Sequence, residues 1–167
     1  VLATGGIGKT FKVTSASWEY TGDGHALAMR AGATTLNMEF IQFHPTGMVW
    51  PLSVKGILVT EGVRGDGGVL KNSEGKRFMF DYIPSVFKGQ YAETVEEADK
   101  WLAEQSGAGD GTARRTPDLL PRDEVARAIN TEVKAGRGSP HGGVYLDVSK
   151  RLTAEVIKKR LPSMWHQ

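Results

Sequence analysis

Clusters of glycine cut this chain into short segments and so limit the length of any helix or strand that it can form. Glycine occurs 21 times in 167 residues, whereas it typically makes up about 7% of a protein. The glycines follow no collagen-like period and form no low-complexity run. Because glycine adopts backbone conformations that other residues avoid, the excess predicts many tight turns and close backbone approaches in a chain the size of one domain.

Charge and composition exclude several classes of function. Lys and Arg total 21 against 19 Asp and Glu, a net charge of +2, which is too even to predict a nucleic acid or an anionic membrane surface as partner. The absence of cysteine excludes disulfides, thiolate metal sites, iron–sulfur ligation by this chain and cysteine nucleophiles. The four histidines lack the close spacing of metal ligands. No apolar run approaches the ~18 residues that span a membrane, so we expect neither a metal site nor a membrane-spanning helix.

The two ends of the chain suggest a larger protein. Val1-Leu2-Ala3-Thr4 is typical of the end of a buried strand, and no Met, charged leader or signal peptide precedes it. The last residues follow a helical stretch without a closing signal. We therefore expect an internal piece of a longer protein.

The first sixty residues predict short elements. A glycine turn follows the strand-like start, and residues 10–20 have no regular pattern. The sequence Thr21-Gly22-Asp23-Gly24 predicts a turn that caps a helix over 25–30. Partial alternation of apolar and polar residues predicts a strand over 36–44, and a β-branched run predicts another over 57–60.

The remainder of the chain predicts more helix than strand. Residues 69–71 and 77–79 flank a loop that is typical of a β-hairpin. Pro121, the acidic residues after it and Gly136 indicate the start and end of the clearest helix. The other expected elements are a helix over 93–105, a flexible loop over 106–112, a strand over 144–148 and a helix over 153–160. Mixed elements without strict β-α-β alternation indicate an α+β fold.

The glycine turn near the start is the first candidate for chemistry. Gly8-Lys9-Thr10 matches the end of a phosphate-binding loop. However, the position of that motif's first glycine is Ala3, and no helical pattern follows Thr10. The favoured interpretation is a turn that lets the backbone approach a cofactor or a neighbouring loop, and a plain tight turn after a strand is the alternative.

Two further segments carry polar groups at glycine-rich bends. His44 stands at the end of an expected strand, directly before Pro45-Thr46-Gly47, where an imidazole can donate to an anionic ligand. Segment 60–68 places a hydroxyl, two carboxylates and a guanidinium among four glycines, so alternate polar groups can converge. A structural histidine and a solvated surface loop are the alternatives for these segments.

The helix after Pro121 presents an unusual arginine. Val125, Ile129 and Val133 recur every four residues and define a buried stripe, and Arg122 projects from the same face. Proteins rarely bury arginine without a partner, and the positive end of a helix dipole disfavours its charge. Arg122 is therefore either a buried cation bound to a carboxylate or to loop carbonyls, or an arginine directed at an anionic ligand.

Five motifs, specific as a set, follow one another along most of the chain. They are Ala3-Thr4-Gly5-Gly6-x-Gly8-Lys9-Thr10, Thr21-Gly22-Asp23-Gly24, Glu39-Phe40-x-Gln42-Phe43-His44-Pro45-Thr46-Gly47, Thr60-Glu61-Gly62-x-Arg64-Gly65 and Arg122-Asp123-x-Val125-Ala126-Arg127-Ala128. This set resembles the flavoprotein subunit of succinate dehydrogenase and fumarate reductase. The resemblance implies the end of an FAD-binding domain over 1–39 and an α+β capping domain over 40–167. The segment between Tyr82 and Arg122 is longer than in compact family members.

The resemblance also implies a role for each matching residue of the cap. In this family, hydride passes between FAD and a dicarboxylate that is held beneath the cap. His44 and Thr60 match ligands of the substrate carboxylates. Arg122 matches the arginine that transfers the proton, and Glu61 and Arg64 match the relay that reconnects it with solvent.

Further implications concern the cofactor and partners. Gly5 and Gly6 match a turn that approaches FAD, and Asp23 matches an aspartate that contacts it. The motif that opens the FAD domain and the later substrate ligands are not in this chain, so it is expected to be inactive alone and to hold FAD weakly or not at all. The whole protein is expected to act on succinate and fumarate. Its expected partners are membrane anchor subunits together with an iron–sulfur subunit, which would place it in the cytoplasm on the inner face of a bacterial membrane.

Two alternatives stay open. L-aspartate oxidase shares the His-Pro-Thr and Arg-Asp patterns, although Gly62 within Thr-Glu-Gly favours the succinate and fumarate branch. The other alternative is a non-catalytic, isolated cap module.

Overall fold

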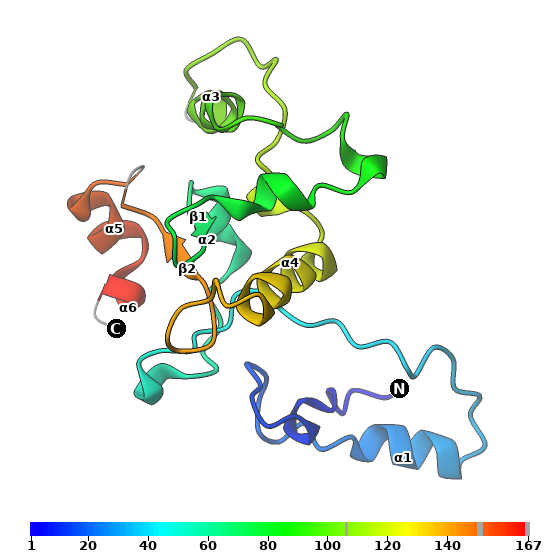
Figure 1. Cartoon of the computed structure of the whole chain (residues 1–167). Helices are drawn as coiled ribbons and strands as arrows, with labels where there is room; N and C mark the ends of the chain where they lie inside the picture. Colours follow the sequence, from blue (N-terminus) through cyan, green and yellow to red (C-terminus); the bar gives the residue numbers. More distant parts are fainter. Residues whose placement is uncertain (106, 150–151, 166–167) are drawn as a thin grey trace. The chain divides into compact units, whose positions relative to one another are not determined.

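The computed structural model describes residues 1–105, 107–149 and 152–165. Its helices and strands (Figure 1) are α1 Asp23–Arg30, α2 Glu61–Gly65, β1 Val69–Lys71, α3 Val95–Gln105, α4 Arg122–Lys134, β2 Tyr145–Asp147, α5 Ala154–Arg160 and α6 Pro162–Trp165. Short 3₁₀ helices lie between them at η1 Gly8–Thr10, η2 Leu52–Val54, η3 Phe78–Tyr82, η4 Ser85–Phe87 and η5 Pro117–Leu119. The predicted mixture of helices and strands is therefore confirmed. Within the described ranges, no helix has the length and apolar character needed to cross a membrane.

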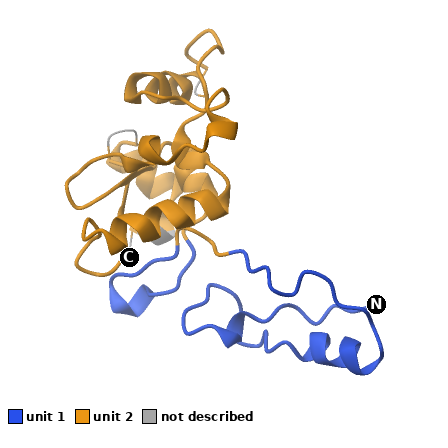
Figure 2. Cartoon of the chain, turned by 45° about the vertical axis from the view of Figure 1, so that its right-hand side comes forward, with its two compact units in different colours: residues 1–42, 47–58 blue, residues 43–46, 59–167 orange. Residues whose placement is uncertain are grey.

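The chain forms two compact units (Figure 2). Unit 1 consists of residues 1–42 and 47–58, and unit 2 consists of residues 43–46 and 59–167. Each unit therefore combines two separate stretches of sequence.

Unit 1 joins the first glycine turn to α1. Gly22 N donates to Gly6 O at 3.2 Å, and Gly22 itself has a φ of 84°, which glycine adopts without strain. A Cβ at Gly24 would overlap the side chain of Thr4. The glycines thus allow the turn and the start of α1 to pack closely.

Two strands predicted for the first sixty residues are wrong. Residues 1–4 and 36–44 form no strand, and residues 57–60 contribute a single bridge, between Leu58 and Gly47. A strand needs a hydrogen-bonded neighbour as well as a suitable local pattern. Among the described residues, the alternating segment finds no such neighbour, and most of its large apolar side chains are exposed.

The core of unit 2 lies between β1, η3 and α4. Its buried apolar side chains are Leu70, Phe78, Met79, Tyr91, Leu120, Val125 and Ala128. The predicted helix after Pro121 is confirmed as α4, and its inner face carries Val125, Ala128 and half-buried Ile129. Because η5 contacts both α2 and α4, it links these two helices within unit 2.

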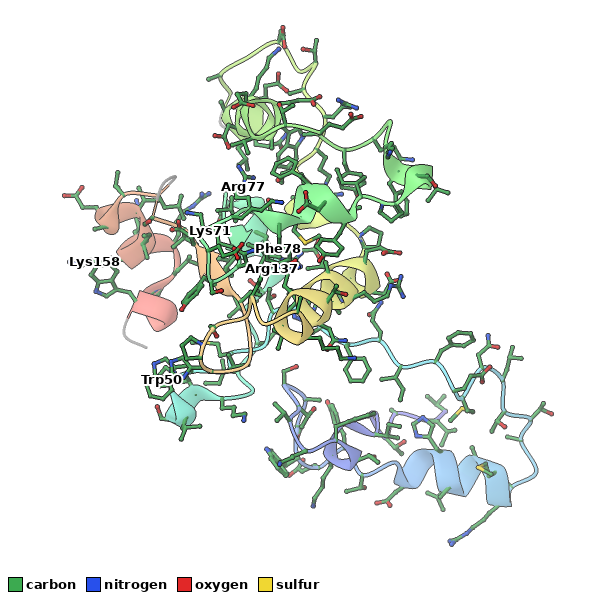
Figure 3. All side chains as sticks on the ribbon, viewed as in Figure 1. Trp50, Lys71, Arg77, Phe78, Arg137 and Lys158 are labelled. Atoms are coloured by element: carbon green, nitrogen blue, oxygen red, sulfur yellow. The ribbon has the colours of Figure 1, made fainter. Side chains whose placement is uncertain are left out.

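The predicted hairpin over 69–79 is wrong. β1 pairs instead with β2 in antiparallel register, with Leu70 opposite Leu146, and the second half of the expected hairpin forms η3. Lys71, labelled in Figure 3, and Asp147 join the two strands through an ion pair of 2.5 Å. The predicted strand over 144–148 is confirmed as β2, but a local pattern could not reveal its partner.

The other predicted helices are confirmed. Residues 93–105 contain α3, residues 153–160 contain α5, and α1 starts two residues before the expected 25–30. In the expected loop over 106–112, Ser106 lies outside the described residues, and the remaining residues form neither helix nor strand.

A buried carboxylate ties α4 to the rest of unit 2. Glu132 is 2% exposed and accepts hydrogen bonds from Tyr82 Oη at 2.6 Å, Asn72 Nδ2 at 3.0 Å and Arg137 Nη2 at 2.7 Å. Arg137 and the core residue Phe78 are labelled in Figure 3. The hydrogen bond from Arg137, with those from Tyr82 and Asn72, lowers the pKa of Glu132 to about 2.

Candidate functional site

The segment around α2 supplies three of the predicted site residues. Thr60 precedes the helix in an extended conformation, and its side chain does not cap the helix. Glu61 lies in the first turn, and Arg64 follows one turn later on this five-residue helix. Gly62 and Gly65 within the helix, and Gly67 and Gly68 after it, keep the helix short, so hydroxyl, carboxylate and guanidinium groups come from a compact stretch of backbone.

Glu61 faces two arginines. Its Oε2 lies 3.6 Å from Arg122 Nε, and its Oε1 lies 3.8 Å from Arg115 Nη2. All three side chains are between 41% and 46% exposed. The structure therefore brings the predicted residues Glu61 and Arg122 together and adds Arg115, which the sequence analysis missed.

The prediction that Arg122 projects from the buried face of its helix is wrong. Arg122 is the first residue of α4, and its side chain is 45% exposed. The first turn reaches past the edge of the core, so the periodicity that buries Val125 does not bury Arg122. The expected partner carboxylate is nevertheless present, because Glu61 approaches it.

The buried arginine of this site is Arg64. It is 1% exposed, and its Nη1 donates to Asp118 O at 2.6 Å. Within the described part of the chain, Nε and Nη2 of Arg64 are buried without a hydrogen-bond partner. Burial lowers the pKa of Arg64, while the negative charges of Glu61 and Asp118 oppose that shift.

His44 belongs to the same unit and is half-buried. Thr46 N donates to His44 Nδ1 at 3.3 Å, and Thr46 is itself fixed because its Oγ1 donates to Val59 O at 2.7 Å. A backbone N–H can only donate, so Nδ1 accepts, and in the neutral ring the proton resides on Nε2. Burial and then the positive charges of Arg122 and Arg64 lower the pKa of His44.

A groove of about 660 Å³ adjoins Glu61. Its walls come from α2, α3, η5 and the segment before η5, through Glu61, Gly62, Gly65, Asp66, Trp101, Gln105, Arg115 and Leu119. One wall thus belongs to the long segment between Tyr82 and Arg122, which sequence reasoning identified but gave no role. The groove gives Glu61 a path to solvent.

The predicted cofactor residues lie in unit 1. Gly5 has a φ of 72°, a Cβ at Gly6 would meet nothing within 4 Å, and Asp23 lies in the first turn of α1. Thr21 Oγ1 donates to Asp23 Oδ2 at 2.9 Å. Open glycine backbone beside a helix N-terminus suits a ligand that carries phosphate groups.

No cluster of three or more potential metal ligands occurs among the residues that the structure describes. The positive groups near Glu61 are instead guanidinium groups, with a neutral imidazole in the same unit. Unit 1 thus contains open glycine backbone at Gly6, and unit 2 contains the arginines that approach Glu61.

Comparison with known proteins identifies the family. Residues 1–167 match the FAD binding domain family, and the chain belongs to it. The chain is 46% identical over 164 residues to one subunit of the fumarate reductase (CoM/CoB) of Methanothermobacter marburgensis, covering 98% of this chain and 24% of that protein. It is 38% identical over 168 residues to the mitochondrial succinate dehydrogenase [ubiquinone] flavoprotein subunit of Oryza sativa subsp. japonica, covering 98% and 21%.

A solved structure shows the same fold. Mycobacterium smegmatis Sdh1 in complex with UQ1 matches with a TM-score of 0.63 and 70% sequence identity, covering 99% of this chain and 22% of that one. The chain therefore spans about a quarter or less of the length of the proteins that it matches. The open backbone at Gly6 and the acidic start of α1 fit one part of an FAD site.

Proposed function

We propose that this chain is part of a flavin-dependent oxidoreductase that interconverts succinate and fumarate. The observation that carries the proposal is the placement of Glu61 between Arg115 and Arg122 in the unit that also holds His44 and Arg64. Such a site offers positive charge and hydrogen-bond donors that can bind a dicarboxylate. It also offers the carboxylate of Glu61, which can move a proton. The names of the relatives support the same substrate pair.

In the proposed complex, His44 and Thr60 bind substrate carboxylates. A neutral His44 whose Nδ1 accepts from Thr46 N presents Nε2–H as a donor. The hydroxyl of Thr60 is a second donor, and it stands next to Glu61 at the start of α2. Two donors that carry no full charge orient the carboxylates without fixing them as tightly as a buried ion pair would.

In the proposed mechanism, Arg122 exchanges the proton at one substrate carbon. Oxidation of succinate removes a hydride from one carbon and a proton from its neighbour, and FAD accepts the hydride when bound. Arg122 first gives a guanidinium proton to Glu61, whose Oε2 lies 3.6 Å from Arg122 Nε, and the neutral guanidine then takes the substrate proton; Glu61 passes its proton on. Arg64 completes the relay, since burial makes its proton easier to lose than that of an exposed arginine. The groove beside Glu61 connects this relay with water.

Unit 1 contributes to the cofactor site in this proposal. Gly5 and Gly6 let the backbone approach FAD, and Asp23 contacts it. We assign residues 1–39 to the end of an FAD-binding domain and 40–167 to a capping domain. Because further FAD and substrate ligands belong to the rest of the protein, the chain alone is expected to be inactive.

The proposed partners of the whole protein follow from the same assignment. An iron–sulfur subunit would carry electrons away from FAD, and membrane anchor subunits would hold the assembly. The chain would then lie in the cytoplasm, at the inner face of the membrane, through these partners.

The test is steady-state oxidation of succinate, with an artificial electron acceptor, by the full-length protein loaded with FAD. The same preparation is assayed with L-aspartate. Oxidation of succinate but not of L-aspartate is the expected result. The opposite preference would support an L-aspartate oxidase, and a full-length protein that retains no FAD would support a non-catalytic module.

A further inference from the structure

Asp118 is a buried junction in unit 2. It is completely buried. Its Oδ1 accepts a hydrogen bond from Leu70 N at 2.8 Å, and its Oδ2 accepts from Arg77 Nη2 at 3.0 Å and from Thr116 Oγ1 at 2.8 Å. The donors come from β1, from the residue before η3 and from the residue before η5, so this one carboxylate joins three segments of the unit.

The backbone of the same residue holds Arg64. Arg64 Nη1 donates to Asp118 O at 2.6 Å, and η5, which contains Asp118, contacts α2, which contains Arg64. The other two nitrogens of this guanidinium have no hydrogen-bond partner among the described residues. Anything that shifts residue 118 therefore shifts the acceptor that fixes Arg64.

The negative charge of Asp118 also offsets part of the positive charge around Arg64. The groups that act on Arg64 are two carboxylates, Glu61 on α2 and Asp118 on η5, and two cations, Arg122 on α4 and Arg115 before η5. The carboxylates favour the charged form of Arg64, and the two arginines oppose it.

The charge of Asp118 is shared with a second cation. Arg77, labelled in Figure 3, pairs with Asp118 at 3.0 Å and with Asp99 of α3 at 3.0 Å. Arg77 therefore shares the carboxylate of Asp118 and connects it to α3. This connection is independent of the contacts that Glu61 makes in the groove.

We propose that Asp118 is a positioning residue of the proton relay: its carbonyl fixes the guanidinium of Arg64, and its carboxylate supplies the counter-charge that keeps this buried arginine protonated between turnovers. The inference rests on the proposed function, because it gives Asp118 a task only if Arg64 moves protons. In this scheme, Arg77 adjusts the counter-charge through its ion pair with Asp118. Asp118 itself touches neither substrate nor cofactor in this scheme.

The experiment compares Asp118→Asn and Arg77→Gln in the full-length protein loaded with FAD. The readouts are the pH dependence of kcat, the KM for succinate and the FAD content. Asp118→Asn removes negative charge near Arg64, so the alkaline limb of the kcat profile should move to lower pH. We expect kcat to fall at least about tenfold while KM changes less than about twofold.

Arg77→Gln should have the opposite effect on the profile. It removes the cation that pairs with the carboxylate of Asp118. This carboxylate should then favour the protonated form of Arg64 more strongly, and the alkaline limb of the kcat profile should move to higher pH. If Asp118→Asn does not accumulate as folded protein, the pH dependence of kcat in Arg77→Gln alone tests the proposal. Asp147→Asn is the matched control, because it removes a partly buried carboxylate from an ion pair with Lys71 on the neighbouring strand.

Opposite displacements of the alkaline limb in the two variants, with the control unchanged, would support the proposal. Profiles of folded Asp118→Asn and Arg77→Gln protein that superimpose on that of the control would overturn it. Failure of the proposed function is a separate result, since the unaltered protein would then show no oxidation of succinate.

Discussion

Glu61 divides its two carboxylate oxygens between two arginines, with Oε2 3.6 Å from Arg122 Nε and Oε1 3.8 Å from Arg115 Nη2. Neither distance is that of a tight salt bridge, and all three side chains retain access to water. An exposed pair of this kind contributes little to stability, about 0–1 kcal/mol. The arrangement therefore does little to hold the fold together, as expected if Glu61 and Arg122 have the proposed role in proton transfer.

The first prediction concerns Arg122. Replacing it by Gln in the full-length protein should lower kcat by a factor of about 10²–10⁴, the range typical of a lost acid–base group. The FAD content should not change, because Arg122 belongs to unit 2 and the proposed cofactor residues of this chain belong to unit 1. Succinate oxidation and flavin absorbance measure the two quantities.

Arg127→Gln is the control for that experiment. Arg127 lies on the same helix, and its side chain is 64% exposed and pairs with Asp123 and Glu124 at 2.6 Å. It should retain nearly full activity. Substantial turnover by the Arg122→Gln protein would remove Arg122 from the mechanism.

A second prediction concerns stability. Glu132→Gln replaces a buried carboxylate that accepts from Tyr82, Asn72 and Arg137. It should lower the free energy of unfolding near neutral pH by on the order of 3 kcal/mol, the value of a shift in pKa from 4.5 to about 2. Urea denaturation followed by circular dichroism measures the loss.

The pH dependence of this effect has a fixed sign. Because folding lowers the pKa of Glu132, its contribution is fully present above pH ~4.5 and disappears as the pH falls towards about 2. The difference between the two proteins should therefore shrink over that interval. Glu124→Gln, on the same helix but more exposed, should change stability by less than about 0.5 kcal/mol; an equal loss in both variants would contradict the prediction.

Local sequence predicts the helices of this chain better than its strands. Pro121, the acidic first turn and Gly136 bound α4, and Thr153 caps α5 by accepting from Val156 N, because these signals act within a few residues. β1 instead pairs with a strand some 76 residues further along. No local pattern records such a partner.

The candidate site also combines features that local sequence predicts with features that depend on distant contacts. The cluster of Thr60, Glu61 and Arg64 could be predicted because these residues are adjacent in sequence. That Arg64 is buried and Arg122 exposed could not, since burial depends on where η5 packs against α2 and α4. Asp118 gave no signal, because a single aspartate after a proline is typical of any turn.

A third prediction concerns His44. Burial and the charges of Arg122 and Arg64 lower its pKa below the usual 6.5, while Glu61 acts in the opposite direction. The imidazole should therefore titrate below pH 6.5 and be neutral throughout the neutral range. Nuclear magnetic resonance of ¹³C-labelled histidine in the full-length protein would follow this titration.

The same measurement tests whether Arg122 acts on His44. Removing the positive charge in Arg122→Gln should move the midpoint of the His44 titration to higher pH. In Arg127→Gln the midpoint should not move. A midpoint that is identical in all three proteins would show that the charge of Arg122 does not reach His44.

The last prediction separates a cofactor role from a structural role at the first glycine turn. A Cβ at Gly6 would meet nothing within 4 Å, so Gly6→Ala should leave unit 1 folded. If FAD approaches this backbone, the added methyl group should occupy space that the cofactor needs, and the FAD content of the full-length protein should fall severalfold. Gly89→Ala in unit 2, where a Cβ is equally unobstructed, is the matched control and should retain FAD. Equal FAD content and equal thermal stability in both variants would mean that the turn is a plain bend in the chain, and the cofactor contact would then have to come from other residues.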